Sequence, residues 1–242
     1  MENKFSRSEQ LFGKEAIELL SKSHIAIFGV GGVGGYVAEA LARTGVGHFT
    51  LIDNDKVSLS NINRQIIATM DTLGKDKVDV MKDRILSINP DAIVEVKKCF
   101  FLPELKNEFD FAQYDYVVDA IDTVKAKIAL VELAEINNTP IISSMGAGNK
   151  VNPTGFVVTD INKTETDPLA KVIRYELKKR GIKKLKVVYS KEKPLTPLNA
   201  EIENGKIPPG SNAFVPPAVG LLIASEVIRD LINEVTRIEL KR

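Results

Sequence analysis

Two basic side chains and a carboxylate in this sequence have the types and spacing that chemistry on a nucleoside triphosphate requires. Arg64 and Lys77 supply positive charge, and Asp122 supplies a carboxylate that can help to hold Mg2+. Transfer of a carboxylate oxygen onto an α-phosphate builds negative charge, which nearby cations stabilise. We therefore expect these three residues to belong to a catalytic site that uses ATP and Mg2+.

Each of these residues also has an explanation that involves no ligand. Arg64 could pair with a surface carboxylate, Lys77 could lie on a solvated helix face, and Asp122 could cap the helix that follows it. All three, however, come just after predicted strands and close to a glycine-rich loop. Because α/β proteins bind ligands at the carboxyl ends of their strands, we expect the three side chains to share one site.

A strand, a glycine-rich loop and a helix follow one another early in the chain and would position the phosphates. The strand is predicted over 24–28, and a second strand over 49–52 ends at Asp53. The glycines of the loop are Gly29, Gly31 and Gly34. Asp53 follows Gly34 by 19 residues, close to the ~20 expected when an acidic residue holds a ribose hydroxyl. This unit is predicted to be a mononucleotide-binding βαβ.

The elements that follow alternate between helix and strand. Helices are predicted over 75–88 and 124–135, and strands over 93–97, 116–118 and 140–143. This alternation predicts an α/β fold with a doubly wound, mostly parallel sheet.

Residues after Gly146 predict a C-terminal α/β extension of the same sheet protein. Its predicted elements are strands near 156–159 and 185–189, a basic helix over 169–180, a mobile loop over 190–211 and an apolar helix over 214–228. The apolar helix is shorter than the ~20 residues of a membrane span, so we expect it to be buried and expect no stable membrane insertion.

Composition favours one intracellular domain. The chain has 242 residues, 44% of them apolar, and a formal net charge of +1. We expect a single domain over 1–242, with an ATP-binding half over 1–150 and a substrate half over 151–242. The single cysteine, Cys99, excludes an internal disulfide and a zinc site of two Cys-x-x-Cys pairs. Residues 1–20 contain no apolar run typical of a signal peptide, and we expect a cytoplasmic protein.

Together these motifs resemble the ATP site of the HesA/MoeB/ThiF superfamily, which is related to ubiquitin-activating enzymes. The matching motifs are Gly29-x-Gly31-x-x-Gly34, Asp53-x-Asp55, Ser60-Asn61-x-Asn63-Arg64-Gln65, Lys77 and Asp119-x-x-Asp122. The resemblance implies a Rossmann-like adenylation domain in which Asp53, Asp55, Asn61 and Gln65 help to bind ATP. It also implies a homodimer, in which Arg7 of the Phe5-Ser6-Arg7 motif reaches the ATP phosphates of the partner.

The second half of the chain resembles one branch of this superfamily. The residues that carry this resemblance are 144–150, 167–171, 178–181, 187–190, 210–211 and 214–216. Members of the branch dehydrate threonylcarbamoyladenosine beside the anticodon of tRNA. The resemblance implies that ATP adenylates the threonyl carboxylate and that a group within the same substrate then closes a ring. No enzyme thiol is needed, and we expect Cys99 to be an inert thiol at the end of a strand, away from the ATP site. Some relatives have Cys at the position of Asp167.

Charge distribution agrees with a nucleic-acid substrate. Residues 163–193 contain 11 Lys or Arg and four acids, a net of +7, so the rest of the chain carries −6. A basic face on an otherwise acidic protein favours binding to a phosphate backbone, although a solvated lysine-rich helix would have the same composition. Tyr175 and Tyr189 could stack on bases, but core packing is the expected role of both.

Two other functions use parts of the same motif set. An activator of the C-terminal carboxylate of a small sulfur-carrier protein shares every ATP-site residue, and a sulfur-transfer protein is a possible partner. This chain lacks the zinc cysteines and the catalytic cysteine common among such activators. A nicotinamide-dependent oxidoreductase would explain the glycines and Asp53 but would leave Arg64, Lys77 and Asp122 without a role.

Overall fold

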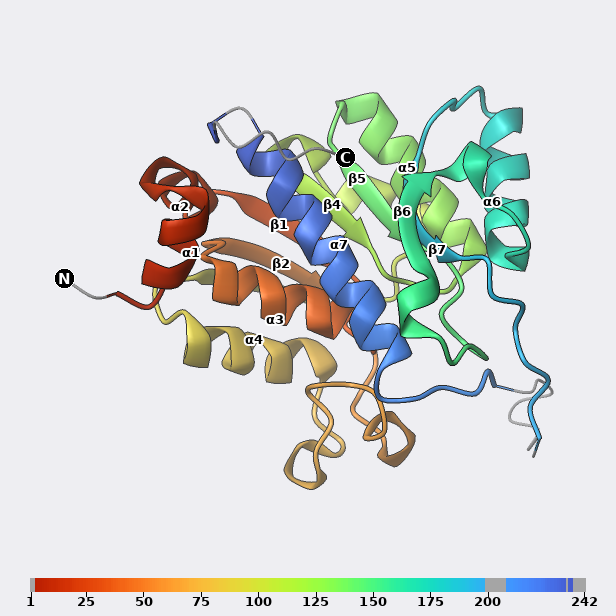
Figure 1. Ribbon diagram of the computed structural model, residues 1–242, viewed down its shortest axis with the longest axis horizontal. Helices are drawn as coiled ribbons and strands as arrows, with labels where there is room; N and C mark the ends of the chain where they lie inside the picture. The colour runs from red at the N-terminus through yellow and green to blue at the C-terminus, as the bar shows by residue number, and fades with distance from the viewer. Residues whose placement is uncertain (1–2, 199–207, 234, 237–242) are drawn as a thin grey trace.

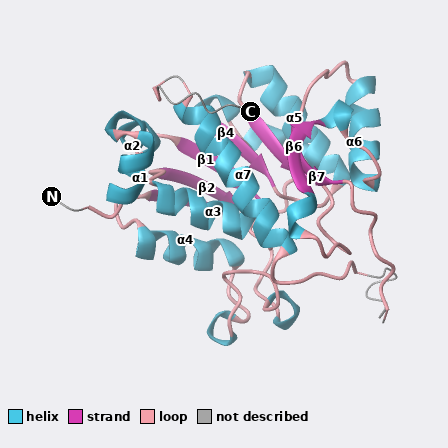
Figure 2. Ribbon diagram, in the orientation of Figure 1, coloured by secondary structure: helices cyan, strands magenta, loops and turns pink. Residues whose placement is uncertain are grey.

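A single seven-stranded sheet runs through the computed structural model, which describes residues 3–198, 208–233 and 235–236 (Figures 1 and 2). The strands are β1 (His24–Phe28), β2 (His48–Ile52), β3 (Ile93–Lys97), β4 (Tyr116–Asp119), β5 (Ile141–Ser144), β6 (Phe156–Asp160) and β7 (Lys186–Ser190). Their order is β3-β2-β1-β4-β5-β7-β6, and every neighbouring pair is parallel except the antiparallel pair β6–β7. The predicted doubly wound, mostly parallel sheet is confirmed.

Helices cover both faces of the sheet. They are α1 (Ser6–Phe12), α2 (Lys14–Leu20), α3 (Gly34–Thr44), α4 (Lys77–Ile88), α5 (Val124–Asn137), α6 (Pro168–Lys179) and α7 (Val215–Ile232). Ile25 and Ile27 of β1 face a core built with α2, α3, α4 and α7, whereas Ala26 and Phe28 face a core built with α5. Successive side chains of a strand point to opposite faces of the sheet. A strand that is buried on both faces therefore has a nearly continuous apolar sequence. Figure 1 shows α7 lying across the strands beside α3.

The chain reverses direction in the sheet between β1 and β4. After β1 it winds outward through β2 to β3. After β4 it winds the other way to β5, continues to the edge strand β6 and returns to β7, which lies between β5 and β6. Loops on either side of such a switch point diverge, which leaves a crevice at the carboxyl ends of the two strands. Gly29 follows β1 and Ala120 follows β4, so both loops predicted to bind ATP open into this crevice.

Several element boundaries differ from the predicted ones by one or two residues, and the end of α7 differs by four. The helix predicted over 75–88 begins at Lys77, because Asp76 has an extended backbone and forms an isolated antiparallel bridge with Lys56. The helix predicted over 214–228 continues to Ile232. Its Pro216 and Pro217 lie in the first turn, where no intrahelical donor is lost. Most of its apolar side chains are buried, and among the described residues no helix is long and apolar enough to cross a membrane.

The predicted loop over 190–211 is described only in part. Ser190 is the last residue of β7, and residues 191–198 and 208–211 form neither helix nor strand. Residues 199–207 lie outside the described residues.

Two histidines stack against each other at the amino ends of β1 and β2, and this pair predicts sensitivity to acid. The rings of His24 and His48 lie 3.4 Å apart at 6°, and Nε2 of His24 lies 2.8 Å from Oγ1 of Thr50. Burial, together with the neighbouring His48, lowers the pKa of His24 to about 4 from an ordinary value of 6.5. The unfolded chain therefore takes up a proton at a higher pH than the folded chain does.

We expect the free energy of unfolding to fall as pH decreases from about 6.5 to about 4, with His24 contributing up to about 3 kcal/mol. In His24→Asn this acid dependence becomes shallower. Urea unfolding at half-unit steps of pH measures the slope. An equally steep slope in the variant would assign the acid sensitivity to other groups.

Candidate active site

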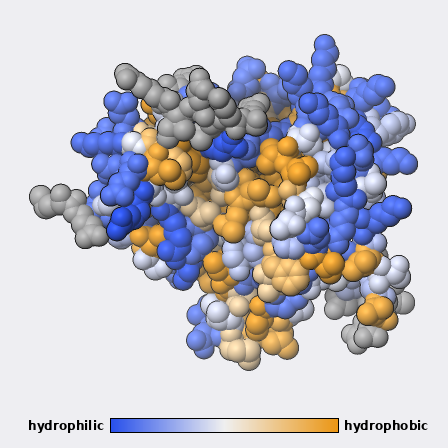
Figure 3. Space-filling view, in the orientation of Figure 1, coloured by the Kyte–Doolittle hydropathy of each residue, from blue (hydrophilic) through white to orange (hydrophobic). Residues whose placement is uncertain are grey.

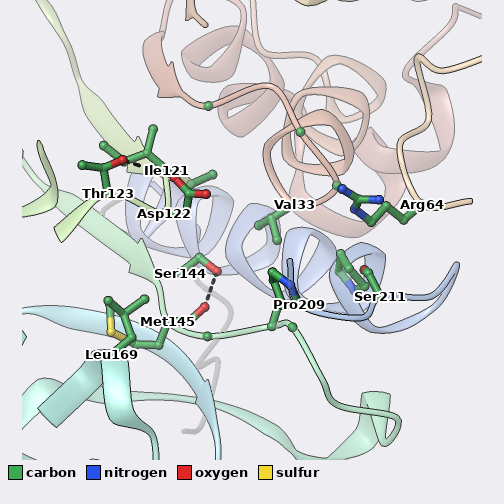
Figure 4. Close-up of a pocket in the computed structure, with 18 of the residues that line it drawn as sticks. Val33, Arg64, Ile121, Asp122, Thr123, Ser144, Met145, Leu169, Pro209 and Ser211 are labelled. Carbon is green, nitrogen blue, oxygen red and sulfur yellow. Dashed lines mark hydrogen bonds between the residues drawn. The ribbon is translucent and has the colours of Figure 1, made fainter. Parts of the chain in front are cut away.

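A cavity of about 820 Å³ opens at the switch point of the sheet. The residues predicted for the ATP site that line it are Gly29, Gly31, Asp53, Asp55, Asn61, Arg64, Gln65, Lys77 and Asp122. Residues 144–150, 167–169 and 208–211 line it as well, so both halves of the chain contribute walls. Figure 4 shows Asp122 and Arg64 on opposite sides of the cavity, with Ser144, Leu169 and Pro209 on a further side.

The glycine loop needs glycine at two positions for steric reasons. Gly29 has a φ of +89°, and a Cβ there would lie 2.7 Å from the carbonyl oxygen of Ala120. A Cβ on Gly34 would lie 1.8 Å from the carbonyl oxygen of Gly29. Gly31 meets no such obstacle and lines the cavity. Its missing side chain therefore leaves room for a ligand to approach the backbone, as phosphate-binding loops require.

Asp53 ties the glycine loop to the end of β2. One carboxylate oxygen accepts a hydrogen bond from the backbone N–H of Val30 at 2.7 Å, and the other accepts from that of Asp55 at 2.8 Å. Each carboxylate oxygen can accept a further hydrogen bond. The same side chain can therefore hold the loop and receive a ribose hydroxyl, the role predicted from its spacing.

Lys77 is buried at the start of α4, so the alternative of a solvated helix face is wrong. The side chain is 7% exposed, and its Nζ lies 2.7 Å from Oδ2 of Asp55. Asp55 is itself 60% exposed, which leaves its carboxylate in solvent on one side. The ammonium is thus held at the cavity wall by a partner that does not enclose it.

Arg64 pairs with no acidic side chain of the described residues, so the surface ion pair considered above is wrong. Its guanidinium donates to the carbonyl oxygen of Ser60 at 2.7 Å and to Oδ1 of Asn63 at 3.0 Å. Partial burial lowers the pKa of Arg64, but arginine stays protonated at neutral pH. Arg64 therefore brings to the cavity a positive charge that no described carboxylate neutralises.

Asp122 does not cap α5, so the helix-capping explanation considered above is wrong. The capping position belongs to Thr123, and no side chain caps the helix there. Oδ1 of Asp122 accepts a hydrogen bond only from the hydroxyl of Thr123 at 3.3 Å. No group of three metal-ligating side chains occurs within the described ranges. A magnesium ion here would therefore take one carboxylate from the protein and its other ligands from phosphates and water, as Mg2+ commonly does.

The two predicted amides have different positions. Oδ1 of Asn61 accepts a hydrogen bond from the backbone N–H of Ser58 at 3.1 Å and so holds the local turn. Gln65 is buried, and its Oε1 has no hydrogen-bond partner in the described structure. Buried polar atoms without partners are rare in folded proteins. Gln65 lines the cavity, so this oxygen can accept a hydrogen bond from a polar ligand that binds there.

Sequence reasoning missed two buried ion pairs around the cavity. Lys150 lines it, and its Nζ donates to Oδ2 of Asp167 at 2.9 Å and to the carbonyl oxygen of Gly146 at 2.6 Å. The other oxygen of Asp167 caps α6 by accepting from the N–H of Ala170. Asp167 before a proline has the pattern of a helix cap, but no local signal indicates Lys150 as its partner.

The second pair lies beneath the Asp122 loop. Lys127 of α5 contacts both carboxylate oxygens of Asp119 at 2.9 and 3.0 Å and donates to the carbonyl oxygen of Ser144 at 2.8 Å. Both side chains are almost completely buried. The ammonium thus joins α5 to the carboxyl ends of β4 and β5.

Cys99 does not lie where it was expected. β3 ends at Lys97, and Cys99 lies in the following loop, half-buried, at the wall of the cavity. The prediction that this thiol is remote from the ATP site is therefore wrong, because the loop turns over the carboxyl ends of the strands. Burial raises the pKa of the Cys99 thiol, which favours the unreactive protonated form at neutral pH.

Arg7, Tyr175 and Tyr189 do not line the cavity. Arg7 lies on α1, exposed, and does not line the cavity. Tyr189 is buried in the core with α6, as expected. Tyr175 is 60% exposed on α6, so its predicted core position is wrong.

The sequence and fold match known proteins over almost their whole length. The profile described as the ThiF family matches residues 5–241. A tRNA threonylcarbamoyladenosine dehydratase of Bacillus subtilis is 46% identical, and the alignment covers 100% of this chain and 98% of that protein. Crystal structures of E. coli tRNA N6-threonylcarbamoyladenosine dehydratase in complex with AMP and with ATP have TM-scores of 0.87 and 0.86 and identities of 37% and 36%. Each comparison covers 96% of this chain and 94% of the other.

Proposed function

The chain belongs to the ThiF family, and from this premise we propose that it is an ATP-dependent tRNA threonylcarbamoyladenosine dehydratase. One observation carries the proposal: the similarity to dehydratases extends through both halves of the chain, and both halves line one cavity. The E. coli relative has been crystallised with ATP and with AMP, which are the first substrate and the last product of adenylation chemistry.

The reaction has two steps that use the same cavity. The threonyl carboxylate of the modified adenosine attacks the α-phosphorus of ATP, and pyrophosphate leaves. A nucleophile within the same substituent then attacks the activated carbonyl, the ring closes and AMP leaves with one carboxylate oxygen. The substrate has lost one water overall. Because the nucleophile is already attached to the substrate, proximity replaces an enzyme nucleophile.

Arg64 and Lys77 stabilise the negative charge that develops on the phosphate oxygens in the first step. In-line displacement at phosphorus places negative charge on the phosphate oxygens, and fixed cations stabilise this charge most where water is excluded. Lys77 is held by Asp55 alone, and Arg64 by neutral oxygens, so both keep donors for phosphate. Gly31 allows the phosphates close to the backbone, Gly29 and Gly34 shape the loop around it, and Asp53, Asn61 and Gln65 contribute to nucleotide binding.

Asp122 is the residue that would help to hold Mg2+ with the triphosphate, and Mg2+ would offset part of its charge. Asp122→Asn keeps the size of the side chain but loses the anionic oxygen that hard cations prefer. We expect turnover of the variant to need a higher magnesium concentration. Titration of activity with MgCl2 at fixed ATP measures this, and an unchanged half-saturating concentration would remove Asp122 from the metal site.

The family relationship also suggests how the protein assembles and where it works. We propose a cytoplasmic homodimer in which Arg7, exposed on α1, reaches the ATP phosphates of the partner subunit. Residues 1–150 would supply most of the ATP site and residues 151–242 most of the tRNA surface. A sulfur-transfer protein remains a candidate partner, and Cys99 is the only thiol of the chain that could receive sulfur.

The decisive test is incubation of the purified chain with ATP, Mg2+ and threonylcarbamoylated tRNA, followed by nucleoside mass spectrometry. We expect a product lighter by one water, together with AMP and pyrophosphate. Adenylation of a sulfur-carrier protein without this product would favour the rival activator. Thermal shift gives a second readout, because a ligand at ~100 times its Kd stabilises by roughly 2.7 kcal/mol. ATP with Mg2+ should stabilise the chain, and NAD should not.

Cys99→Ser tests the cysteine-free mechanism directly. We expect the variant to form the cyclic product, although the hydroxyl costs on the order of 1–3 kcal/mol of stability if it stays unpaired. Activity is compared at a temperature where both proteins are folded. If the folded variant binds ATP and tRNA but forms no product, a thioester intermediate must be considered.

A further inference from the structure

The outer face of α6 carries cations that the described acidic side chains do not neutralise. We define the α6 face by its exposed residues Lys171, Val172, Tyr175, Lys178 and Lys179. Their spacing places them opposite the buried residues of the helix. Among the described residues, neither Lys171 nor Lys178 forms an ion pair, and Lys179 lies over the ring of Tyr175, 4.2 Å from its centroid. Hydrophilic side chains cover this edge of the molecule (Figure 3).

Helix stability explains only part of this arrangement: Lys178 and Lys179 are in the last turn of α6, where the helix dipole favours cations, but Lys171 is not. Lys171 is in the first turn of α6, where the helix dipole is positive, and no acidic residue of the helix lies in that turn. A cation there is unfavourable for the isolated helix. Glu176, the only acid of α6, is already bound by Lys179 and Arg180. The charge of the face is therefore suited to an anion outside the protein.

The α6 face begins at the wall of the cavity. Pro168 and Leu169, the first two residues of α6, line the cavity, and Lys171 is within one turn of them. Lys171 and Lys178 are seven residues apart, or about 10 Å along the helix axis, so they can contact different phosphates of one strand. Exposed Lys183 and Lys184 extend the positive surface beyond the end of the helix.

An exposed tyrosine lies between the two lysines. Tyr175 is 60% exposed, unlike the buried Tyr189, so the ring face that Lys179 does not cover is available to a partner. Single-stranded RNA combines phosphates with unstacked bases, and proteins bind it by alternating cations with aromatic rings. A lipid surface would match the lysines but would not require the aromatic ring between them.

We propose that the α6 face binds the anticodon arm of the tRNA substrate, with Lys171 and Lys178 against phosphates and Tyr175 against a base. This inference rests on the proposed function, since it assumes that the modified adenosine enters the adjoining cavity. The face then guides the single-stranded nucleotides next to that adenosine toward ATP.

The test compares tRNA binding by Lys171→Glu/Lys178→Glu with binding by Lys22→Glu/Lys82→Glu. The control lysines lie by α2 and on α4, on the opposite side of the molecule from α6 (Figure 1). We expect the affinity of the α6 variant for threonylcarbamoylated tRNA to fall roughly tenfold or more, with a salt dependence shallower by roughly two in slope. The control variant should keep the affinity and slope of the unaltered chain.

Tyr175 is tested separately. Tyr175→Ala should weaken tRNA binding by roughly fivefold or more, because one base stack is lost, and Tyr175→Phe should keep most of the affinity. Filter binding at several salt concentrations gives these values. Stabilisation by ATP in thermal shift should be the same in all variants, which shows that each is folded with an intact nucleotide site.

Three results would overturn the proposal. Unchanged tRNA affinity and salt slope in the α6 variant, with binding by the unaltered chain intact, would remove α6 from the tRNA surface. Loss of binding to phosphatidylglycerol vesicles with tRNA binding retained would assign the face to lipid. Failure of the unaltered chain to bind or convert tRNA would instead overturn the proposed function, and this inference with it.

Discussion

Arg64→Ala is expected to lower kcat/KM by about 10²–10³-fold while the unfolding temperature stays close to that of the unaltered chain. Within the described residues the guanidinium makes two hydrogen bonds, to Ser60 and Asn63, and both involve exposed groups. Its loss therefore costs little folding energy. In the transition state of adenylation, by contrast, the variant lacks one of the two cations proposed to stabilise the phosphate charge.

Matched variants separate charge from geometry at this position. Arg64→Lys keeps a positive charge but loses the planar fork of donors, so we expect an intermediate loss. Lys75→Ala removes an exposed cation of the same segment that does not line the cavity and should leave the rate unchanged.

Lys77→Met keeps the buried stem and removes the ammonium, and a loss similar to that of Arg64→Ala is expected. Equal losses of melting temperature and activity would instead make these residues structural.

The architecture and the nucleotide loop were predictable because local patterns determine them. Buried parallel strands are rich in apolar residues on both faces, as in 25–28, and the helices that cover them have one apolar face. Gly34 is required by a backbone approach within the same βαβ unit, to the carbonyl oxygen of Gly29, and Gly29 has a φ of +89°, which favours glycine. The α6 boundaries were predicted to within one residue because Asp167 and Pro168 mark its start.

What could not be predicted depends on contacts between segments far apart in the sequence. Cys99 was expected at the end of a strand, yet the chain leaves the sheet at Lys97 and passes over the cavity. Lys150 and Asp167 are 17 residues apart, and only the packing of α6 against the loop before β6 brings them together. Most lysines in folded proteins are exposed, so the sequence alone does not predict that Lys150 is buried.

Lys127 shows how strongly such a buried cation should contribute to stability. Its ammonium has three acceptors, two on Asp119 and one on Ser144, and it does not line the cavity. Lys127→Met fits the space but leaves the carboxylate of Asp119 buried without its counter-charge. Removing one partner of a buried ion pair typically destabilises by about 3–5 kcal/mol. We therefore expect a fall in melting temperature on the order of 10 °C in a chain of this length.

A second substitution decides whether the loss comes from the unpaired charge. Lys127→Met/Asp119→Asn removes both charges and keeps an acceptor for the N–H of Ile121, so it should be more stable than Lys127→Met alone. Urea unfolding at pH 7 measures all three proteins, with Lys77→Met as a matched control. Because Asp55, the partner of Lys77, is 60% exposed, that control should lose little stability although it loses activity. If the double variant is less stable than Lys127→Met, the lost contacts of the lysine, rather than an unpaired carboxylate, account for the effect.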